Sequence, residues 1–247
     1  SDLYLPESWA NDRDRCREIC QMQADCSGGA ECAFVLYDTS ELGGPSAKRL
    51  ATVCRPIEDR TALGGSCIVQ SGLTSDACNT THCDMAPYLA GLSNSAPCAP
   101  LCASSADCRA DQVCGLVYDG LAETPNLAST QEASGRYFEA IRGCYTPIFQ
   151  SSPGSWEPLP PGAGTLGAAC DASSPDGKLA CRSHLCAGFD PIPNRCTDYC
   201  DGDADCVSAS TQDWRCRVRE VSLSGTFLES FGIADNTKFV LTGVCAP

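Results

Sequence analysis

The stretch Cys102-Ala-Ser-Ser-Ala-Asp107-Cys108-Arg-Ala-Asp-Gln-Val-Cys114 recurs in related form three times along a chain of 247 residues. Each copy begins as Cys-x3-Cys-x5-Cys and carries Ala-Asp directly before the last of these cysteines. Each copy then passes through a long insertion to a final cysteine that is soon followed by proline. The three copies span 16–54, 98–144 and 196–245. The chain is therefore a series of repeated segments defined by cysteine spacing.

A second type of segment, with three cysteines, opens on Leu-Gly at Leu63 and again at Leu166. It precedes only the second and third copies, which gives two units of eight cysteines and a first unit of five, and accounts for all 21. We place the first unit at 1–56, the second unit at 57–147, and the third unit at 148–247, where a Pro-rich linker comes first. Such units are expected to stack end to end, each contacting mainly its neighbours.

Cysteines at this density and in ordered spacing indicate disulfides formed in an oxidising compartment. Structural zinc is the competing interpretation, but zinc sites favour close Cys-x2-Cys pairs and histidine. The chain has no Cys-x2-Cys and only 2 histidines. Because small cysteine-rich units bury too little surface to fold on an apolar core alone, disulfides should supply much of their stability.

The long insertions begin and end in short β-branched and aromatic runs around loops rich in Gly, Pro and Asn, which indicates hairpins. The expected strand pairs are 33–37 with 49–53, 115–118 with 136–141, and 217–221 with 238–242. The predicted fold is small, disulfide-rich and mostly β. It consists of three tandem units, each with a long hairpin stapled at its base by cysteines, with little helix and an elongated arrangement.

The net charge of −14 and the lack of a basic stripe argue against nucleic acid and anionic membranes as partners. No run approaches the ~20 apolar residues of a membrane span, and the residues after Ser1 lack the features of a signal peptide. Because disulfides require export, we expect a mature secreted chain, extracellular or at a cell surface, with the periplasm as an alternative. The sequence leaves open a lipid-bearing cysteine before Ser1 and glycosylation at Asn79.

The five-cysteine segment resembles the cysteine-rich modules of Dickkopf and colipase proteins. The matching residues are Cys102-x4-Asp107-Cys108-x5-Cys114, then Gly143-Cys144 and a proline, together with the Leu-Gly-x-x-Cys opening of the other segment. In that family the first of four cysteines pairs with the third, and the second with the fourth. The resemblance therefore implies the pairs Cys20–Cys32, Cys26–Cys54, Cys67–Cys83, Cys78–Cys98, Cys102–Cys114, Cys108–Cys144, Cys170–Cys186, Cys181–Cys196, Cys200–Cys216 and Cys206–Cys245. The lipase and Wnt-receptor binding of that family is not carried over, because a fold does not fix a function.

Cys16 corresponds in the repeat to Cys98 and Cys196, which under this pairing reach back to Cys78 and Cys181. No cysteine before Cys16 in this sequence could play that part, so we expect Cys16 to be the odd one. It could be free, could bridge to Cys16 of another copy, or could bridge to a different protein.

The sequence offers one weak candidate for a metal site. Asp201, Asp203 and Asp205 resemble the start of a calcium loop, although the later ligands of an EF-hand are missing. The alternative, which we favour, is that Asp205 caps a turn through backbone N–H groups, as Asp25 and Asp107 would in the other copies.

No catalytic constellation stands out. His82 and His184 lie at different offsets from their neighbouring cysteines, and no nucleophile, zinc-protease or phosphate-binding motif is present. The sequence therefore predicts a protein that is not an enzyme and needs no cofactor.

Two apolar sets could contact a partner, and packing against a neighbouring unit is an equal alternative for both. They are the N-terminal arm with Leu3, Tyr4, Leu5 and Trp9, and the third insertion with Phe227, Leu228, Phe231 and Ile233. Hairpin edges could also accept an added strand. We expect a secreted, non-enzymatic structural or protein-interaction component of an extracellular or cell-surface assembly, such as a filament, a surface layer or an accessory subunit. The alternative is a secreted inhibitor or receptor ligand that acts through a hairpin loop.

Overall fold

The computed structural model of the chain describes most of its residues. The described ranges are 19–38, 48–57, 60–69, 72–73, 78–80, 82–84, 86–89, 91, 93–123, 137–152, 155–173, 179–189, 192–207, 213–222 and 239–247. Cys16, the N-terminal arm and the tip of the third insertion lie outside these ranges.

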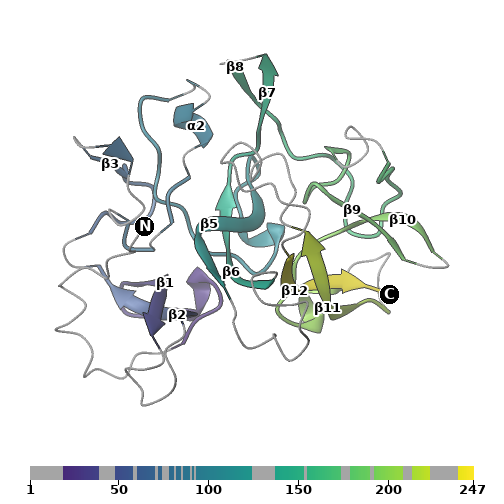
Figure 1. Cartoon of the computed structure of the whole chain (residues 1–247), viewed down its shortest axis with the longest axis horizontal. Coiled ribbons are helices and arrows are strands. Elements are labelled where there is room, and N and C mark those ends of the chain that lie inside the picture. The colour runs from purple at the N-terminus through teal and green to yellow at the C-terminus, as the bar shows by residue number, and fades with distance from the viewer. Residues whose placement is uncertain are drawn as a thin grey trace.

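Three long antiparallel hairpins dominate the structure, one in each unit (Figure 1). Hairpin 1 consists of β1 (Ala30–Asp38) and β2 (Lys48–Pro56). Hairpin 2 consists of β5 (Val113–Glu123) and β6 (Tyr137–Tyr145), and hairpin 3 of β11 (Arg215–Ser222) and β12 (Phe239–Ala246). The strands form where the sequence is rich in Val, Leu, Tyr and Phe, as expected. The predicted small, disulfide-rich and mostly-β fold is confirmed.

Shorter elements connect the hairpins. They are β3 (Ile68–Val69) with β4 (Gly72–Leu73), β7 (Ile148–Ser152) with β8 (Ser155–Pro158), β9 (Leu185–Phe189) with β10 (Ile192–Thr197), the short helix α2 (Ala86–Leu89), and the 3-10 turns η1 (Gln23–Asp25), η4 (Ser105–Asp107) and η6 (Asp203–Cys206). The β7–β8 hairpin falls at the start of the third unit, where the sequence suggests a linker. Its apolar residue Ile148 is buried, and Pro158 stands at the strand end, where proline is tolerated.

Ten disulfides link the described cysteines, and they are the ten pairs that the family resemblance implies. They group into five four-cysteine modules, each with the first cysteine bonded to the third and the second to the fourth. The modules begin at Cys20, Cys67, Cys102, Cys170 and Cys200. Cα–Cα distances are 5.8–6.0 Å for every first-to-third bond and 5.2–5.4 Å for every second-to-fourth bond. The eight-cysteine unit is therefore two copies of one smaller motif.

The last two cysteines of a module lie directly opposite each other on paired strands but are not bonded to each other. Cys114 faces Cys144 in hairpin 2, and Cys216 faces Cys245 in hairpin 3. Each reaches instead to a cysteine in the loop before the hairpin. The two bonds therefore tie that loop to both strands at the base of the hairpin.

The core is small and consists largely of these sulfur atoms. Clusters of buried cysteines are joined by a few larger side chains, such as Trp214 beside Cys200 and Cys206. This composition is expected for units with little apolar surface, where crosslinks replace much of the hydrophobic core.

Neighbouring units pack together through their hairpins. Phe34 of hairpin 1 lies in one buried cluster with Leu101 and Ile141 of the second unit. Between the second and third units, β12 pairs in parallel with β6 at Phe239↔Tyr137 and Val240↔Phe138. Hairpins 2 and 3 thus form one four-stranded sheet in the order β11-β12-β6-β5. Figure 1 shows the units following one another in chain order, with their hairpins also lying side by side.

Polar contacts join the first unit to the second. The carboxylate of Glu31 accepts a hydrogen bond from the backbone N–H of Leu63 at 2.9 Å. Arg55, directly opposite Glu31 on β2, donates from Nε to Asn79 Oδ1 at 3.0 Å. Because Glu31, Arg55 and Asn79 are all buried, these contacts are shielded from solvent and fix the first unit against the second.

Candidate interaction surface

β11, in hairpin 3, is one of the two outer strands of the four-stranded sheet; the other is β5, whose residues 113–116 are buried. The backbone N–H of Cys216 donates to Asp203 Oδ1 at 2.9 Å, on the side away from β12. Its partner across the hairpin, Cys245, donates its N–H to Asp198 O at 2.9 Å, away from β11. In an antiparallel ladder the alternate residues of a strand share one direction. The N–H and C=O of Val218 therefore also point outward, and they have no hydrogen-bond partner among the described residues.

The two faces of β11 differ in chemistry. Arg215, Arg217 and Arg219 alternate along one face, and all three side chains are exposed. Val218 lies on the other face with 73% of its surface exposed. Leu241 of β12, diagonal to Val218 on that same face, is 41% exposed. Glu220, also exposed, lies on the face of Val218 and opposite Leu241. The strand thus presents a basic face, a mixed face of apolar residues and Glu220, and a backbone edge between them.

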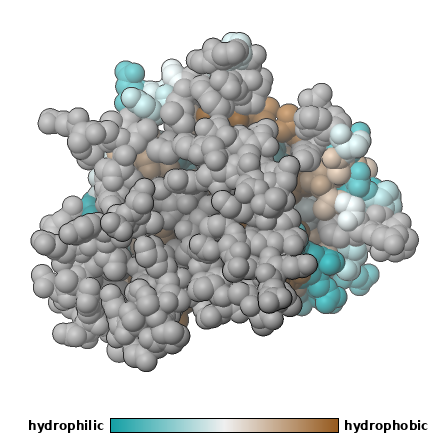
Figure 2. All heavy atoms as spheres, in the orientation of Figure 1, coloured by the Kyte–Doolittle hydropathy of each residue, from teal (hydrophilic) through white to brown (hydrophobic). Residues whose placement is uncertain are grey.

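The basic face is unusual for a chain of net charge −14. Arg215 lies 3.6 Å from Asp203, with both side chains well exposed. Arg217 and Arg219 form no ion pair within the described part of the chain. Figure 2 shows hydrophilic side chains gathered near the C-terminal end of the chain, with hydrophobic ones above them. On a protein of net negative charge, a row of exposed arginines is a local positive patch, and it attracts negatively charged groups that the rest of the surface repels.

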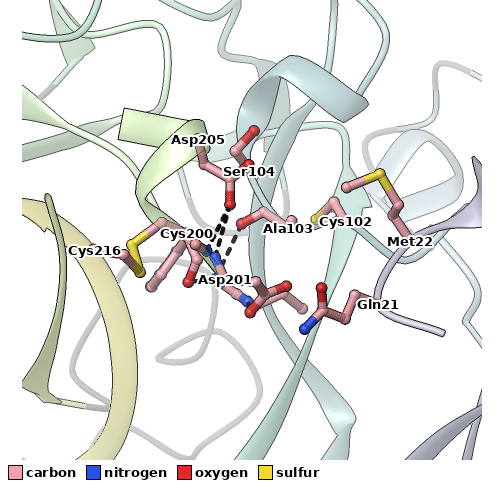
Figure 3. A network of polar contacts seen from close by, with 12 residues as sticks. Gln21, Met22, Cys102, Ala103, Ser104, Cys200, Asp201, Asp205 and Cys216 are labelled. Carbon is pink, nitrogen blue, oxygen red and sulfur yellow. Dashed lines mark hydrogen bonds and ion pairs between the residues drawn. A yellow bond between two sulfur atoms is a disulfide. The ribbon is translucent and has the colours of Figure 1, made fainter. Parts of the chain in front are cut away.

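A polar junction between the second and third units holds this sheet in place. Asp198 accepts hydrogen bonds from the backbone N–H and the hydroxyl of Ser105, both at 3.0 Å. Arg142 of β6 donates to the carbonyls of Ala103 at 3.0 Å and Cys200 at 3.1 Å, and it also pairs with Asp201. Figure 3 shows the polar contacts in this region, with Asp201 and Cys200 of the third unit beside Ala103 of the second.

Burial raises the pKa of several groups at this junction. Desolvation raises the pKa of Asp198 to about 6, although its hydrogen bonds from Ser105 oppose the shift. Burial likewise raises the pKa of Asp201, against the attraction of Arg142. Desolvation raises the pKa of Tyr199 to about 12, and Arg142 lies 5.6 Å from the centre of that ring. The junction is therefore the most electrostatically perturbed part of the described third unit.

The three acidic residues considered for calcium have separate protein partners. Asp201 pairs with Arg142, and Asp203 accepts from Cys216 N. Asp205 accepts from the backbone N–H groups of Asp201 at 2.9 Å and Gly202 at 3.1 Å. Their carboxylates therefore do not converge on a common point, and the groups of convergent metal-ligand atoms among the described residues consist of disulfide sulfurs.

The repeated Ala-Asp-Cys has one structural meaning in all three copies. Asp107 accepts from the N–H groups of Ala103 and Ser104, both at 2.9 Å, just as Asp205 accepts from the equivalent residues. Asp25 accepts from Gln21 at 2.7 Å and from the next residue at 3.0 Å, and these bonds lower its pKa. Each aspartate stands at the third position of a 3-10 turn and satisfies N–H groups that the turn leaves unpaired.

The other residues that the sequence singled out either hold backbone groups in the fold or lie outside the described residues. His82 Nε2 is 2.8 Å from the carbonyl of Cys144, and His184 Nε2 is 3.3 Å from that of Pro160. Asn79 is buried, with its amide donating to Arg55 O at 3.1 Å, so a glycan on that nitrogen does not fit the folded structure. Cys16, Leu3, Tyr4, Leu5, Trp9, Phe227, Leu228, Phe231 and Ile233 lie outside the described residues.

Sequence reasoning predicted open hairpin edges but did not single out β11. The available signal was the alternation Arg-x-Arg-x-Arg at 215–219, which overlaps the strand predicted at 217–221, since period-2 spacing places all three on one face of a strand. What it could not reveal was that hairpins 2 and 3 share a sheet, and that this pairing leaves β11, and not β12, as an outer strand.

Comparison with known proteins gives no further guide to this surface, because no family model, no curated protein and no solved structure matches the chain. Among the helices of the described residues, none has the length and apolar character needed to cross a lipid bilayer. The abundant disulfides are typical of extracellular proteins.

Proposed function

We propose that this chain is a secreted, non-enzymatic structural or protein-interaction component of an extracellular or cell-surface assembly. The observation that carries the proposal is the exposed hairpin edge of β11, held on a scaffold of crossed disulfides. A crosslinked base fixes the strand before any partner arrives, so little conformational entropy is lost on binding. A binding module without a large core can be kept rigid in this way.

The surroundings of the two histidines support a role other than catalysis. His82 is buried against a backbone carbonyl, and His184 lies in another unit, also beside a carbonyl. Burial lowers the pKa of His184. Each imidazole is thus engaged in holding backbone, and neither is hydrogen-bonded to a serine or cysteine nucleophile in the described residues.

Cys16 offers a second means of joining an assembly. Its counterparts in the repeat, Cys98 and Cys196, are buried and bonded to Cys78 and Cys181. A cysteine at the same place, four residues before the first cysteine of a module, is suited to closing a module with a cysteine supplied from outside this sequence. Intact mass with alkylation before and after reduction tests this: a single modified or externally bridged thiol at Cys16 is expected.

The proposal is tested by isolating the protein from its source without reductant and identifying what accompanies it. Covalent crosslinking followed by mass spectrometry should place other extracellular proteins, or further copies, against the third unit. Recovery of the chain as an isolated monomer that binds one protease or receptor through the loop between β11 and β12 would instead favour the alternative, a secreted inhibitor or ligand. Catalytic turnover of any substrate by the purified chain would contradict both.

A further inference from the structure

The open edge of β11 is specific enough to indicate the chemistry of its occupant. On its outer side the bond from Cys216 N–H to Asp203 is an intramolecular cap, and two residues farther along the outward N–H and C=O of Val218 have no partner among the described residues. A strand laid along this side could continue the ladder of a four-stranded sheet. The backbone of β11 therefore selects an extended peptide as its partner.

Side chains of an added strand alternate between the two faces of the sheet. On one face they would meet Arg217 and Arg219, which are exposed and without an ion pair among the described residues. On the other face they would meet the exposed side chains of Val218 and Leu241 and that of Glu220, which already has an interaction within the chain. Cross-strand pairs of opposite charge and of apolar residues both stabilise a sheet. The complementary strand thus has acidic residues alternating with apolar ones.

A second copy of β11 is a poor occupant of the same edge. In an antiparallel pair centred on Val218, Arg217 of one copy would lie opposite Arg219 of the other, and like charges directly opposite destabilise a sheet. Charged edge strands commonly prevent such self-pairing. The same arginines that repel an identical strand attract an acidic one, so the charge selects among partners.

The base of β11 is rigid enough for this recognition. Cys216 is bonded to Cys200, and Cys245 opposite it is bonded to Cys206, so both strands are tied to the same loop. That loop is in turn joined to the second unit through Arg142 and Asp201. The edge is consequently held in the strand conformation without its partner.

We infer that β11 binds an extended segment of a partner protein in which acidic and apolar residues alternate, by addition of that segment as a fifth strand. This inference rests on the proposed interaction function and names the partner chemistry of its candidate surface. Raised salt weakens such binding, because both charges are exposed to solvent.

The test uses the full disulfide-intact chain and a short synthetic peptide that alternates glutamate with valine. Saturable binding by calorimetry is expected at low ionic strength, together with slower hydrogen exchange at the amide of Val218. Arg217→Glu should weaken binding by about tenfold, whereas Arg109→Glu, the same charge change at an exposed site in the second unit, should leave it within about twofold.

Backbone recognition is tested separately by Val218→Pro, which removes the outward N–H but no ladder bond to β12. It should abolish binding while far-UV circular dichroism and the disulfides stay unchanged. Equal binding of a peptide with lysine in place of glutamate, or undiminished binding by either β11 variant, overturns the inference, as does the lack of any saturable binding.

Concentration-dependent self-association that Val218→Pro abolishes also overturns it, by assigning the edge to a second copy. Two other results separate the proposed function from the inference about β11. If the chain co-purifies with an assembly through another surface while the peptide does not bind, only the inference about β11 fails. If the peptide binds but crosslinking in the source reveals no partner, the assembly role fails.

Discussion

Hairpins 2 and 3 have the same disulfide pattern but differ in exposure to solvent. In both, the last two cysteines of a module face each other, Cys114 with Cys144 and Cys216 with Cys245. Yet the stretch 113–116 of β5 is buried, whereas 217–220 of β11 is exposed. The cysteines therefore fix the backbone of each hairpin, and the residues between them decide whether the strand is buried or exposed to solvent.

The contrast follows from a few substitutions at equivalent positions. Gly115 and Arg217 each directly follow the third cysteine of their modules. A Cβ at Gly115 would lie 2.3 Å from Cε1 of Tyr145, so that position accepts no side chain without rearrangement. At Arg217 the side chain is exposed to solvent. The close approach of Tyr145 is therefore possible in hairpin 2 because glycine leaves room for its ring.

The largest expected effect comes from removing a crosslink. Cys102→Ser with Cys114→Ser should lower the free energy of unfolding by about 3 kcal/mol, because the unfolded chain regains the freedom of the closed loop. Both neighbouring units pack on this module, so hydrogen exchange should rise in all three units. Urea unfolding and residue-resolved exchange measure the two effects.

The matched variant, Cys200→Ser with Cys216→Ser, sharpens the comparison. Its increase in exchange should stay mainly within the third unit, since the described part of hairpin 3 lies at one edge of the shared sheet and hairpin 2 lies between units. Equal disturbance of the first unit by both double variants would show that hairpin 2 is not the central support.

Exchanging the residues that follow the third cysteine should have a smaller but unequal effect. Gly115→Arg should cost about 1–3 kcal/mol of stability, because the new side chain displaces the Tyr145 ring in a packed site. Arg217→Gly should cost about 1 kcal/mol or less, reflecting only strand propensity. Thermal unfolding of both variants checks this, and equal losses would remove the distinction between the buried and exposed hairpins.

The sequence revealed much of the scaffold and less of the candidate surface. Repeat spacing located the three long hairpins, since β-rich runs bracketed each insertion, and the family resemblance implied the pairs seen in the structure. Local sequence could not reveal the parallel contact of Phe239 with Tyr137, which joins residues about 100 positions apart and depends on how whole units pack. The position of β11 as an outer strand follows from that contact, and the proposed role of Arg217 and Arg219 depends on it.

The junction between the two hairpins should respond to pH through Asp198. Because burial raises its pKa from 3.8 to about 6, the folded protein holds this proton more tightly than the unfolded chain does. This contribution to stability therefore rises as the pH falls through about 6 and levels off near 4. Asp198→Asn should flatten that part of the stability profile, measured by urea unfolding between about pH 4 and pH 8.

Asp111→Asn is the control for this titration, since Asp111 is exposed and pairs only with the exposed Arg109 among described residues. It should leave the profile close to that of the unchanged protein. A profile for Asp198→Asn that parallels the unchanged protein through pH 6 would mean that Asp198 titrates normally and that the junction is solvated.

A small effect is also expected at the turn caps. Asp107→Ala and Asp205→Ala should each cost about 1 kcal/mol, because two backbone N–H groups lose their acceptor in each case. Asp107→Asn should recover part of the loss, since an amide oxygen still accepts. Similar losses in the two units, by urea unfolding, would support a shared role; a loss confined to Asp205 would point to a separate function for the acidic cluster.

The central claim is that cysteines facing each other across a hairpin are never bonded to each other. Mapping disulfides by proteolysis of the unreduced protein and mass spectrometry tests it directly. The account predicts peptides that join Cys102 to Cys114 and Cys108 to Cys144, with the same crossed pattern in the other four modules. A bond between Cys114 and Cys144, or between Cys216 and Cys245, would contradict it.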